Sequence, residues 1–212
     1  MKREEKNALS RQRILDAAIH EFSQRGYAGA SLNTVCAEKG ISKGIIYHYF
    51  KDKDELYLAC VRLSFEQLTQ YMRNRKNCFE GSLEEKLQAY FDGRSHFFAE
   101  NPVLLGIFAD AVFHAPAHLA RQVASCKEEL DGFSLSVLTE CLGSVSIRAG
   151  LTVSVIAEDF KNYMDYFNVR FAGGLDGHAS AEAVLREHEE RCHRQLNMLL
   201  YGVVGDQHEN NG

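Results

Sequence analysis

The chain has 212 residues and carries 24 Lys and Arg against 29 Asp and Glu, a net charge of −5. Hydrophobic residues make up 45% and charged residues 25%, which excludes a disordered chain, because such chains are poorer in apolar residues and more heavily charged. Only 2 prolines occur, which favours long helices over a turn-rich β fold. The acidic balance argues against a nucleic-acid partner for the chain as a whole, so we compare the charge region by region.

The N-terminal residues 1–7 are charged and do not resemble a signal peptide. No apolar run reaches the ~20 residues that span a bilayer, so we expect a cytoplasmic protein with no membrane partner. The spacing of the cysteines predicts free thiols in a reducing compartment, with a thiol redox sensor as the alternative. The six cysteines are Cys36, Cys60, Cys78, Cys126, Cys141 and Cys192.

The first predicted element is an amphipathic helix over residues 10–25. Ile14 and Phe22 lie on its apolar face, at a spacing of two helical turns. Ser10 is a suitable N-cap. Gly26 can adopt the left-handed conformation that ends a helix. The pattern predicts a helix over residues 10–25 that Ser10 caps and Gly26 ends.

Two short helices follow, and together they predict a helix-turn-helix. Ser31 can cap a helix over residues 32–39, and Gly40 ends it. Ser42 can cap the next helix, over residues 43–49. Two short helices joined by a tight turn that contains glycine are typical of this motif. The second of them is about 10 Å long and fits a major groove about 12 Å wide.

The rest of the chain predicts six more helices and no strand. Their expected N-termini are marked by capping boxes at Asp52 and Ser82, by a proline at residue 102, and by the caps Thr152 and Ser180. The expected helices cover residues 53–75, 83–99, 102–115, 117–142, 152–172 and 180–201. The fold class is therefore all-α, with about nine helices. We expect a helix-turn-helix domain over residues 1–56, a helical domain over residues 57–204 and a flexible polar tail over residues 205–212.

The segment from Ser42 to Phe50 (SKGIIYHYF), followed by Lys51-Asp52-Lys53-Asp54-Glu55-Leu56, closely resembles the DNA-binding region of the TetR family of bacterial transcriptional regulators. The resemblance covers residues 10–56. It implies a homodimer with two N-terminal heads and a C-terminal domain for ligand binding and dimerisation. It also implies repression that a small molecule relieves. Three residues depart from the family pattern: Cys36, Lys39 and Ile45.

The regional charge agrees with this resemblance. Residues 1–56 carry 10 Lys and Arg against 8 Asp and Glu, whereas residues 57–212 carry 14 against 21. We therefore expect the head to bind double-stranded, palindromic operator DNA, since phosphate contacts supply most non-specific affinity. The candidate DNA-binding residues are Ser31, Ser42, Lys43, Gly44, Ile45, Tyr47, His48 and Lys53.

Each of these residues has an expected role. By the resemblance, Ser31, Tyr47 and Lys53 contact phosphates. Lys43 and His48 are the candidates for reading base edges. The alternative for Ser31, and likewise for Ser42, is a helix cap with no DNA contact.

Five further residues of this segment have an expected place. Ile45 is a candidate for a thymine methyl, and Gly44 would allow close approach to DNA. Ile46 and Phe50 are expected in the core, and Tyr49 is expected either to pack inward or to face DNA.

The expected ligand domain carries an arginine, Arg94, within an apolar stripe. Arg94 either pairs with an internal carboxylate or grips an anionic ligand in a pocket. The aromatic and soft side chains around it predict a pocket for a moderately apolar ligand, although each is also a candidate for ordinary core. The candidate ligand-binding residues are Phe65, Leu68, Met72, Tyr90, Arg94, Phe97, Ile107, Phe108, Ala111, His114, Val123, Cys126 and Phe133.

The last two expected helices have broad apolar faces. The resemblance implies that they pair with their copies in a homodimer, and isologous pairing suits a palindromic operator. The candidate dimer-interface residues are Ile156, Phe160, Tyr163, Phe167, Phe171, Leu196, Leu199 and Leu200.

Two groups of residues are candidates for a metal site. Asp110, His114 and His118 have helical spacing, but Pro116 interrupts it, and His188 with Cys192 forms only a pair. We expect no metal and no cofactor.

The sequence favours a ligand-responsive DNA-binding regulator, of the repressor type. The alternative is a helical small-molecule-binding protein that has lost DNA binding. An enzyme is not expected, because the chain has no phosphate loop, nucleophile elbow or helical metal motif.

Overall fold

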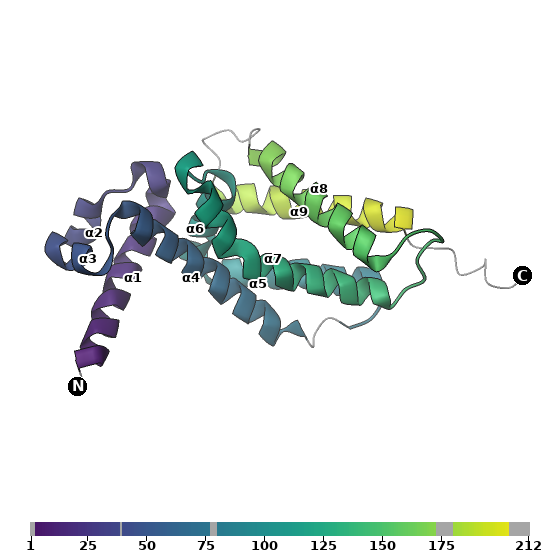
Figure 1. Ribbon diagram of the computed structural model, residues 1–212, viewed down its shortest axis with the longest axis horizontal. Coiled ribbons are helices and arrows are strands. Elements are labelled where there is room, and N and C mark those ends of the chain that lie inside the picture. The colour runs from purple at the N-terminus through teal and green to yellow at the C-terminus, as the bar shows by residue number, and fades with distance from the viewer. Residues whose placement is uncertain (1–2, 39, 77–79, 173–179, 204–212) are drawn as a thin grey trace, which may run out of the picture. The chain divides into compact units, whose positions relative to one another are not determined.

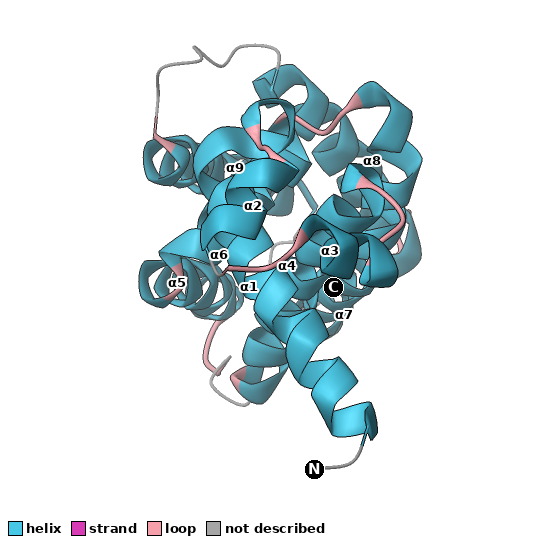
Figure 2. Ribbon diagram, turned by 90° about the vertical axis from the view of Figure 1, so that its left-hand side faces the viewer, coloured by secondary structure: helices cyan, strands magenta, loops and turns pink. Residues whose placement is uncertain are grey.

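A computed structural model describes residues 3–38, 40–76, 80–172 and 180–203. This part of the chain is almost entirely helical and contains no strand (Figures 1 and 2). The elements are α1 (Arg3–Gly29), α2 (Leu32–Glu38), α3 (Lys43–Tyr49), α4 (Lys53–Asn74), α5 (Leu83–Glu100), α6 (Pro102–Phe113), the 3₁₀ turn η2 (Ala117–Leu119), α7 (Ala120–Gly143), α8 (Val153–Ala172) and α9 (Ala181–Val203). The all-α class is confirmed.

The expected caps begin most of these helices. Ser42 accepts a hydrogen bond from the Ile45 N–H (3.3 Å) at the start of α3. At α5, Ser82 accepts from the Glu85 N–H (3.2 Å), and the Glu85 carboxylate accepts from the Ser82 N–H (2.7 Å). This is a capping box, which satisfies two backbone donors that a helix leaves free at its N-terminus. Local sequence therefore determines where these helices begin.

The start of α1 differs from the prediction. The helix begins at Arg3 rather than after Ser10, because residues 4–9 contain good helix formers and no breaker. Gly26 interrupts it as expected, with a φ of +61° that other residues rarely adopt. One further turn then runs to Gly29.

The chain forms two compact units. The first contains residues 1–67 and 101–128, and the second contains residues 68–100 and 129–212. The first unit therefore includes α6, although we expected the N-terminal domain to end at residue 56. The reason is a close approach between α6 and α1, where a Cβ at Gly106 would lie 2.7 Å from the Ser23 carbonyl oxygen. Without a side chain at residue 106, the two helices can pack tightly.

Each unit has its own core. In the first, fully buried side chains of α1, α3 and α4 include Ile14, Ile46 and Tyr57. Ile46 and Phe50 are buried, as expected. The second unit is built on α5, α7, α8 and α9, and its central cluster contains Leu87, Leu138, Leu142, Ile156, Leu196 and Leu200.

No single described helix is both long and apolar enough to cross a membrane. Residues 102–113 and 117–143 meet that length and composition only when joined, and they are bent by 91° to each other.

Candidate nucleic-acid interface

The exposed face of α3 presents the side chains expected to read DNA. Lys43 and His48 are exposed, and Tyr47 has 49% of its surface accessible. Ile45 is 45% accessible, which is unusual for so apolar a side chain and places it beside these polar groups. The face thus combines a cation, two aromatic rings with polar atoms, and an apolar group that suits a thymine methyl.

Gly44 lies in the first turn of α3 and has no neighbour that requires a glycine. A Cβ at this position would have no other heavy atom within 4 Å, and the φ of Gly44 is not positive. The internal packing of the head would therefore accept alanine. A glycine here leaves room on the outer side of the helix, where another molecule can approach the backbone.

The two serines act as caps in the structure. Ser31 Oγ accepts from the Asn33 N–H (3.2 Å), and Ser42 Oγ accepts from the Ile45 N–H (3.3 Å). A hydroxyl that accepts in this way keeps its own O–H to donate. Capping and a phosphate contact are therefore compatible at both residues.

Tyr49 has an intramolecular partner. It is half-buried, and its hydroxyl donates to Asn7 Oδ1 of α1 (3.2 Å). Its ring also meets the His48 ring edge-on, at a centroid distance of 4.9 Å. Tyr49 therefore links the end of α3 to the N-terminal turns of α1.

Lys53 begins α4 and lies over an aromatic ring. Its Nζ is 4.5 Å from the centroid of the Tyr27 ring, a geometry that attracts a cation to the face of the ring. The Tyr27 hydroxyl in turn donates to Asp54. The Lys53 ammonium, which is expected to contact phosphate, thus has a defined position over the Tyr27 ring.

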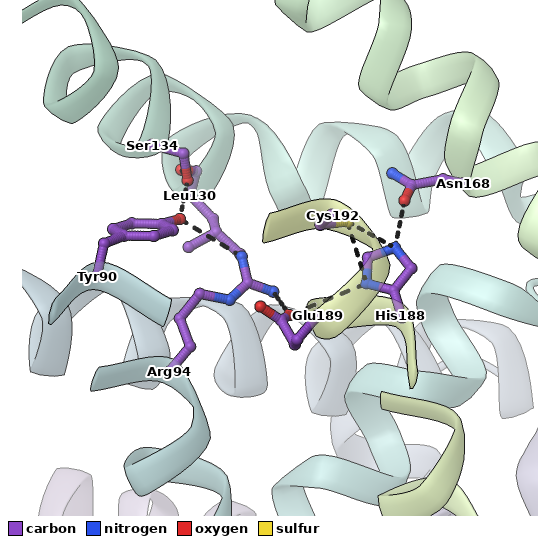
Figure 3. A network of polar contacts seen from close by, with 8 residues as sticks. All are labelled: Tyr90, Arg94, Leu130, Ser134, Asn168, His188, Glu189 and Cys192. Carbon is purple, nitrogen blue, oxygen red and sulfur yellow. Dashed lines mark hydrogen bonds and ion pairs between the residues drawn. The ribbon is translucent and has the colours of Figure 1, made fainter. Parts of the chain in front are cut away.

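The second unit contains a buried polar network across four helices (Figure 3). Arg94 Nη2 of α5 donates to Glu189 Oε1 of α9 over 2.7 Å, and only 13% and 8% of these side chains are exposed. Pairing with an internal carboxylate was one of the two expectations for Arg94. Ser134 Oγ donates to the Leu130 carbonyl (2.8 Å), so the Tyr90 hydroxyl donates to Ser134 (2.6 Å).

The same network continues from α9 to α8. His188 Nε2 lies 2.7 Å from Asn168 Oδ1, and because an amide oxygen only accepts, the ring nitrogen donates. Cys192 Sγ lies 3.7 Å from both nitrogens of the same ring. His188 Nδ1 is 3.9 Å from Glu189 Oε1.

Burial and charge act in opposite directions on the ion pair. Burial raises the pKa of Glu189, but the Arg94 charge and the nearby His188 outweigh it and hold the pKa below its ordinary value. Glu189 Oε2 is buried and has no hydrogen-bond partner among the described residues. Such an acceptor is costly to bury and can take a hydrogen bond from a bound molecule.

The candidate ligand-binding residues do not fall in one unit. Phe65, Ile107, Phe108, Ala111, His114, Val123 and Cys126 belong to the first, and Leu68, Met72, Tyr90, Arg94, Phe97 and Phe133 belong to the second. All are largely buried except Arg94, which is half-buried as a residue, and His114, which is exposed.

The candidate metal ligands have other partners. Asp110 Oδ2 accepts from the Tyr57 hydroxyl (2.7 Å) and from the Tyr27 N–H (3.1 Å). His118 Nε2 lies 3.1 Å from Asp54 Oδ2. Among the described residues, no three His, Cys, Asp or Glu side chains are arranged to hold a metal ion.

Half of the candidate dimer residues are buried in the core of the protomer and are not available to a partner copy. Ile156, Phe171, Leu196 and Leu200 are buried within it, whereas Leu199 is exposed. The remaining three, Phe160, Tyr163 and Phe167, are half-buried. The exposed apolar side chains of α8 and α9 are Val155, Tyr166, Val169, Met198, Leu199 and Tyr201.

Sequence reasoning did not identify several polar contacts. Glu21 is buried and accepts from the Ser31 N–H (2.9 Å), and Asp110 joins α6 to the end of α1. Glu189, the partner of Arg94, lies 95 residues further along the chain. Only Glu21 carried a local signal, since it lies within the apolar run of α1, seven residues after Ile14 and directly before Phe22.

The three-helix head and the all-helical remainder define a helix-turn-helix protein. Residues 14–60 match the family model described as bacterial regulatory proteins, tetR family. Over these residues the chain is similar to the DNA-binding region of TetR-family regulators.

Curated relatives share part of the chain. The HTH-type transcriptional regulator BetI of Escherichia coli is 34% identical over 87 residues, which cover 41% of this chain and 45% of BetI. BetI of Paraburkholderia phytofirmans is 37% identical over 81 residues, or 38% and 42% of the two chains. The chain thus spans less than half the length of these two relatives.

Solved structures share the fold more completely. The transcriptional regulator FadR from Bacillus subtilis, in complex with stearoyl-CoA, has a TM-score of 0.61 at 19% identity, with 85% of this chain and 96% of FadR covered. A tetR-family regulator from Mesorhizobium loti has a TM-score of 0.62 at 18% identity, with 97% and 100% covered. At these identities the likeness concerns the fold alone.

Proposed function

We propose that this protein is a ligand-responsive DNA-binding transcriptional regulator of the repressor type, which acts on a palindromic operator in the bacterial cytoplasm. The observation that carries the proposal is the outer face of α3. There Lys43, Tyr47 and His48 are exposed beside a glycine that the head's own packing does not need. Polar side chains that are exposed together on one face of a helix-turn-helix suit base and phosphate contacts.

Selection of bound duplexes from a random DNA pool tests this proposal. We expect one enriched palindrome, and we expect Lys43→Ala to weaken its binding by about ten-fold or more, since a good base contact contributes about 1–3 kcal/mol. Tyr47→Ala should weaken it too, because it removes a phosphate contact. The matched control is Lys76→Ala, an exposed lysine that follows α4. A protein that enriches no sequence would support the alternative, a small-molecule-binding protein without DNA binding.

The effector is proposed to bind in the second unit, beside the Arg94–Glu189 pair. The buried and unsatisfied Glu189 Oε2 supports a ligand that donates a hydrogen bond, by a hydroxyl, amide or ammonium group. An acidic ligand would instead have to displace Glu189 from Arg94. A panel of alcohols, amines and carboxylates of matched chain length tests this by thermal shift. We expect the donors to stabilise the wild type more than the carboxylates, and the reverse order would contradict the proposal.

A homodimer is proposed through α8 and α9. These helices expose Tyr166, Val169, Met198 and Tyr201, each with more than 60% of its surface accessible. Exposed apolar side chains that recur along both helices in this way are typical of an interaction surface. A two-fold pairing of this face would give each palindromic half-site one head.

Charges placed on that face test the dimer. We expect Tyr166→Glu with Val169→Glu to give a monomer at micromolar concentration in sedimentation, because two like charges would face their copies. The control is Ser154→Glu, an exposed position near the start of α8. A wild-type monomer would contradict the proposal.

A further inference from the structure

The turn that follows the main part of α1 is shaped to receive a carboxylate from α6. Gly26 has a φ of +61°, and a Cβ there would lie 2.5 Å from Asp110 Oδ1. Any other residue would therefore push the carboxylate away. With glycine in place, the next backbone N–H, that of Tyr27, donates to Asp110 Oδ2 over 3.1 Å.

The same oxygen also accepts a hydrogen bond from a residue of α4. The Tyr57 hydroxyl donates to Asp110 Oδ2 over 2.7 Å, and Tyr57 is completely buried. Its ring meets the Tyr27 ring edge-on, with centroids 5.1 Å apart. Burial raises the pKa of Asp110, and the hydrogen bonds from Tyr57 and Tyr27 offset part of that rise. One carboxylate of α6 thus connects the end of α1 to α4.

Tyr27 is held from several directions. Its N–H is bound by Asp110, and its hydroxyl donates to Asp54 in the first turn of α4. That hydrogen bond, with burial, raises the pKa of Tyr27 to about 12, so the hydroxyl stays protonated and remains a donor. The ring of His118 lies edge-on at 5.8 Å, and His118 also contacts Asp54.

The free face of this ring carries Lys53, whose Nζ lies 4.5 Å from the ring centroid. Lys53 precedes Asp54 directly, so backbone and ring together restrict the ammonium. We infer that Tyr27 and Asp110 are positioning residues for DNA binding: Asp110 fixes Tyr27, and the Tyr27 ring places the Lys53 ammonium for a phosphate of the operator. The inference rests on the proposed function. It gives α6 an indirect role in DNA binding, because Asp110 acts through Tyr27 and Lys53 and does not itself touch DNA.

A double-mutant cycle tests the inference. The dissociation constant and its salt dependence are measured by fluorescence anisotropy on the selected palindrome, and thermal unfolding is followed in parallel. Lys53→Ala removes one phosphate contact per head, which lowers the slope of log K against log salt by about 0.9 for each. We expect Tyr27→Leu to give the same loss, and the double variant Tyr27→Leu with Lys53→Ala to bind no worse than Lys53→Ala alone.

Conservative variants distinguish positioning from a structural role. Tyr27→Phe keeps the ring and should retain the salt slope, and Asp110→Asn keeps an acceptor oxygen, whereas Asp110→Ala should lose affinity and slope together. Glu128→Gln, an exposed carboxylate on α7, is the control for the charge change.

The outcomes separate the two proposals. If the effects of Tyr27→Leu and Lys53→Ala add, or if Tyr27→Leu lowers only the melting temperature and leaves the slope unchanged, the inference is wrong and the proposed function stands. If the wild type binds neither the selected palindrome nor a random duplex of the same length, both are wrong.

Discussion

The two units of this protein use polar residues in opposite ways. On α3 of the first unit, Lys43, Tyr47 and His48 are exposed and Gly44 has no neighbour that requires it. In the second unit, Arg94 and Glu189 are buried and bind each other. Polar side chains exposed together on one helix face point to an outside partner, whereas a buried pair is required by the fold itself. Variants of the first kind should therefore weaken binding, and variants of the second kind should weaken stability.

The largest expected effect is on the buried pair. Arg94→Ala leaves the Glu189 carboxylate buried without its cation, which we expect to lower the free energy of unfolding by about 3–5 kcal/mol. Replacing both residues with methionine should recover most of that loss, because no charge is then buried alone. Urea unfolding of the three proteins measures this.

The exposed pair Arg73 and Glu129 is the control, since about half of each side chain is accessible. Arg73→Ala should change stability by less than about 1 kcal/mol. An Arg94→Ala protein as stable as this control would remove the contrast between buried and exposed polar groups.

The next effect is on the pH dependence of stability, because the pKa values of two buried carboxyls, Glu189 and Asp110, are shifted in opposite directions. The pKa of Glu189 is lowered from its ordinary 4.5, so its contribution is present above that pH and is lost as the pH falls through the lowered value. The pKa of Asp110 is raised above its ordinary 3.8, so unfolding free energy increases as the pH falls through the raised value.

The free energy of unfolding, measured at several pH values between about 6 and 3, separates the two contributions. Relative to the wild type, Glu189→Gln should lose less stability on acidification, and Asp110→Asn should lose more. The same direction in both variants would contradict this difference between the two carboxyls.

The smallest effect on stability is expected at Gly44. Alanine has room there and is the better helix former, so Gly44→Ala should leave the protein as stable or up to about 1 kcal/mol more stable. The added methyl should nevertheless weaken binding to the selected palindrome, because it occupies the face that we propose to contact DNA. An unchanged dissociation constant would show that α3 does not approach DNA at this residue.

Local signals predicted most helix starts, because caps and prolines act over three or four residues. Ser42, Ser82, Thr152 and Ser180 each accept a hydrogen bond from a backbone N–H in the first turn of the next helix. The start of α1 was missed, because Ser10 resembles a cap but lies within a longer run of helix formers.

The partners of buried polar groups could not be predicted in the same way. Arg94 was recognised as a group that needs a partner, yet Glu189 lies 95 residues away, and only packing brings them together. Asp110 was considered with His114 and His118 because of helical spacing, whereas its partners are Tyr27 and Tyr57. Similarly, the apolar faces of α8 and α9 were visible in sequence, but their division between core and surface depends on how the helices rotate.

The central claim is that the exposed face of α3 reads a DNA sequence. The most direct measurement is the ratio of affinities for the selected palindrome and for a scrambled duplex, in the wild type, Lys43→Ala and Lys53→Ala. We predict that Lys43→Ala lowers the ratio about ten-fold or more, since a base contact contributes about 1–3 kcal/mol of discrimination. Lys53→Ala should weaken both duplexes equally and leave the ratio unchanged. A wild-type ratio near one, or a ratio that Lys43→Ala does not change, would contradict the claim.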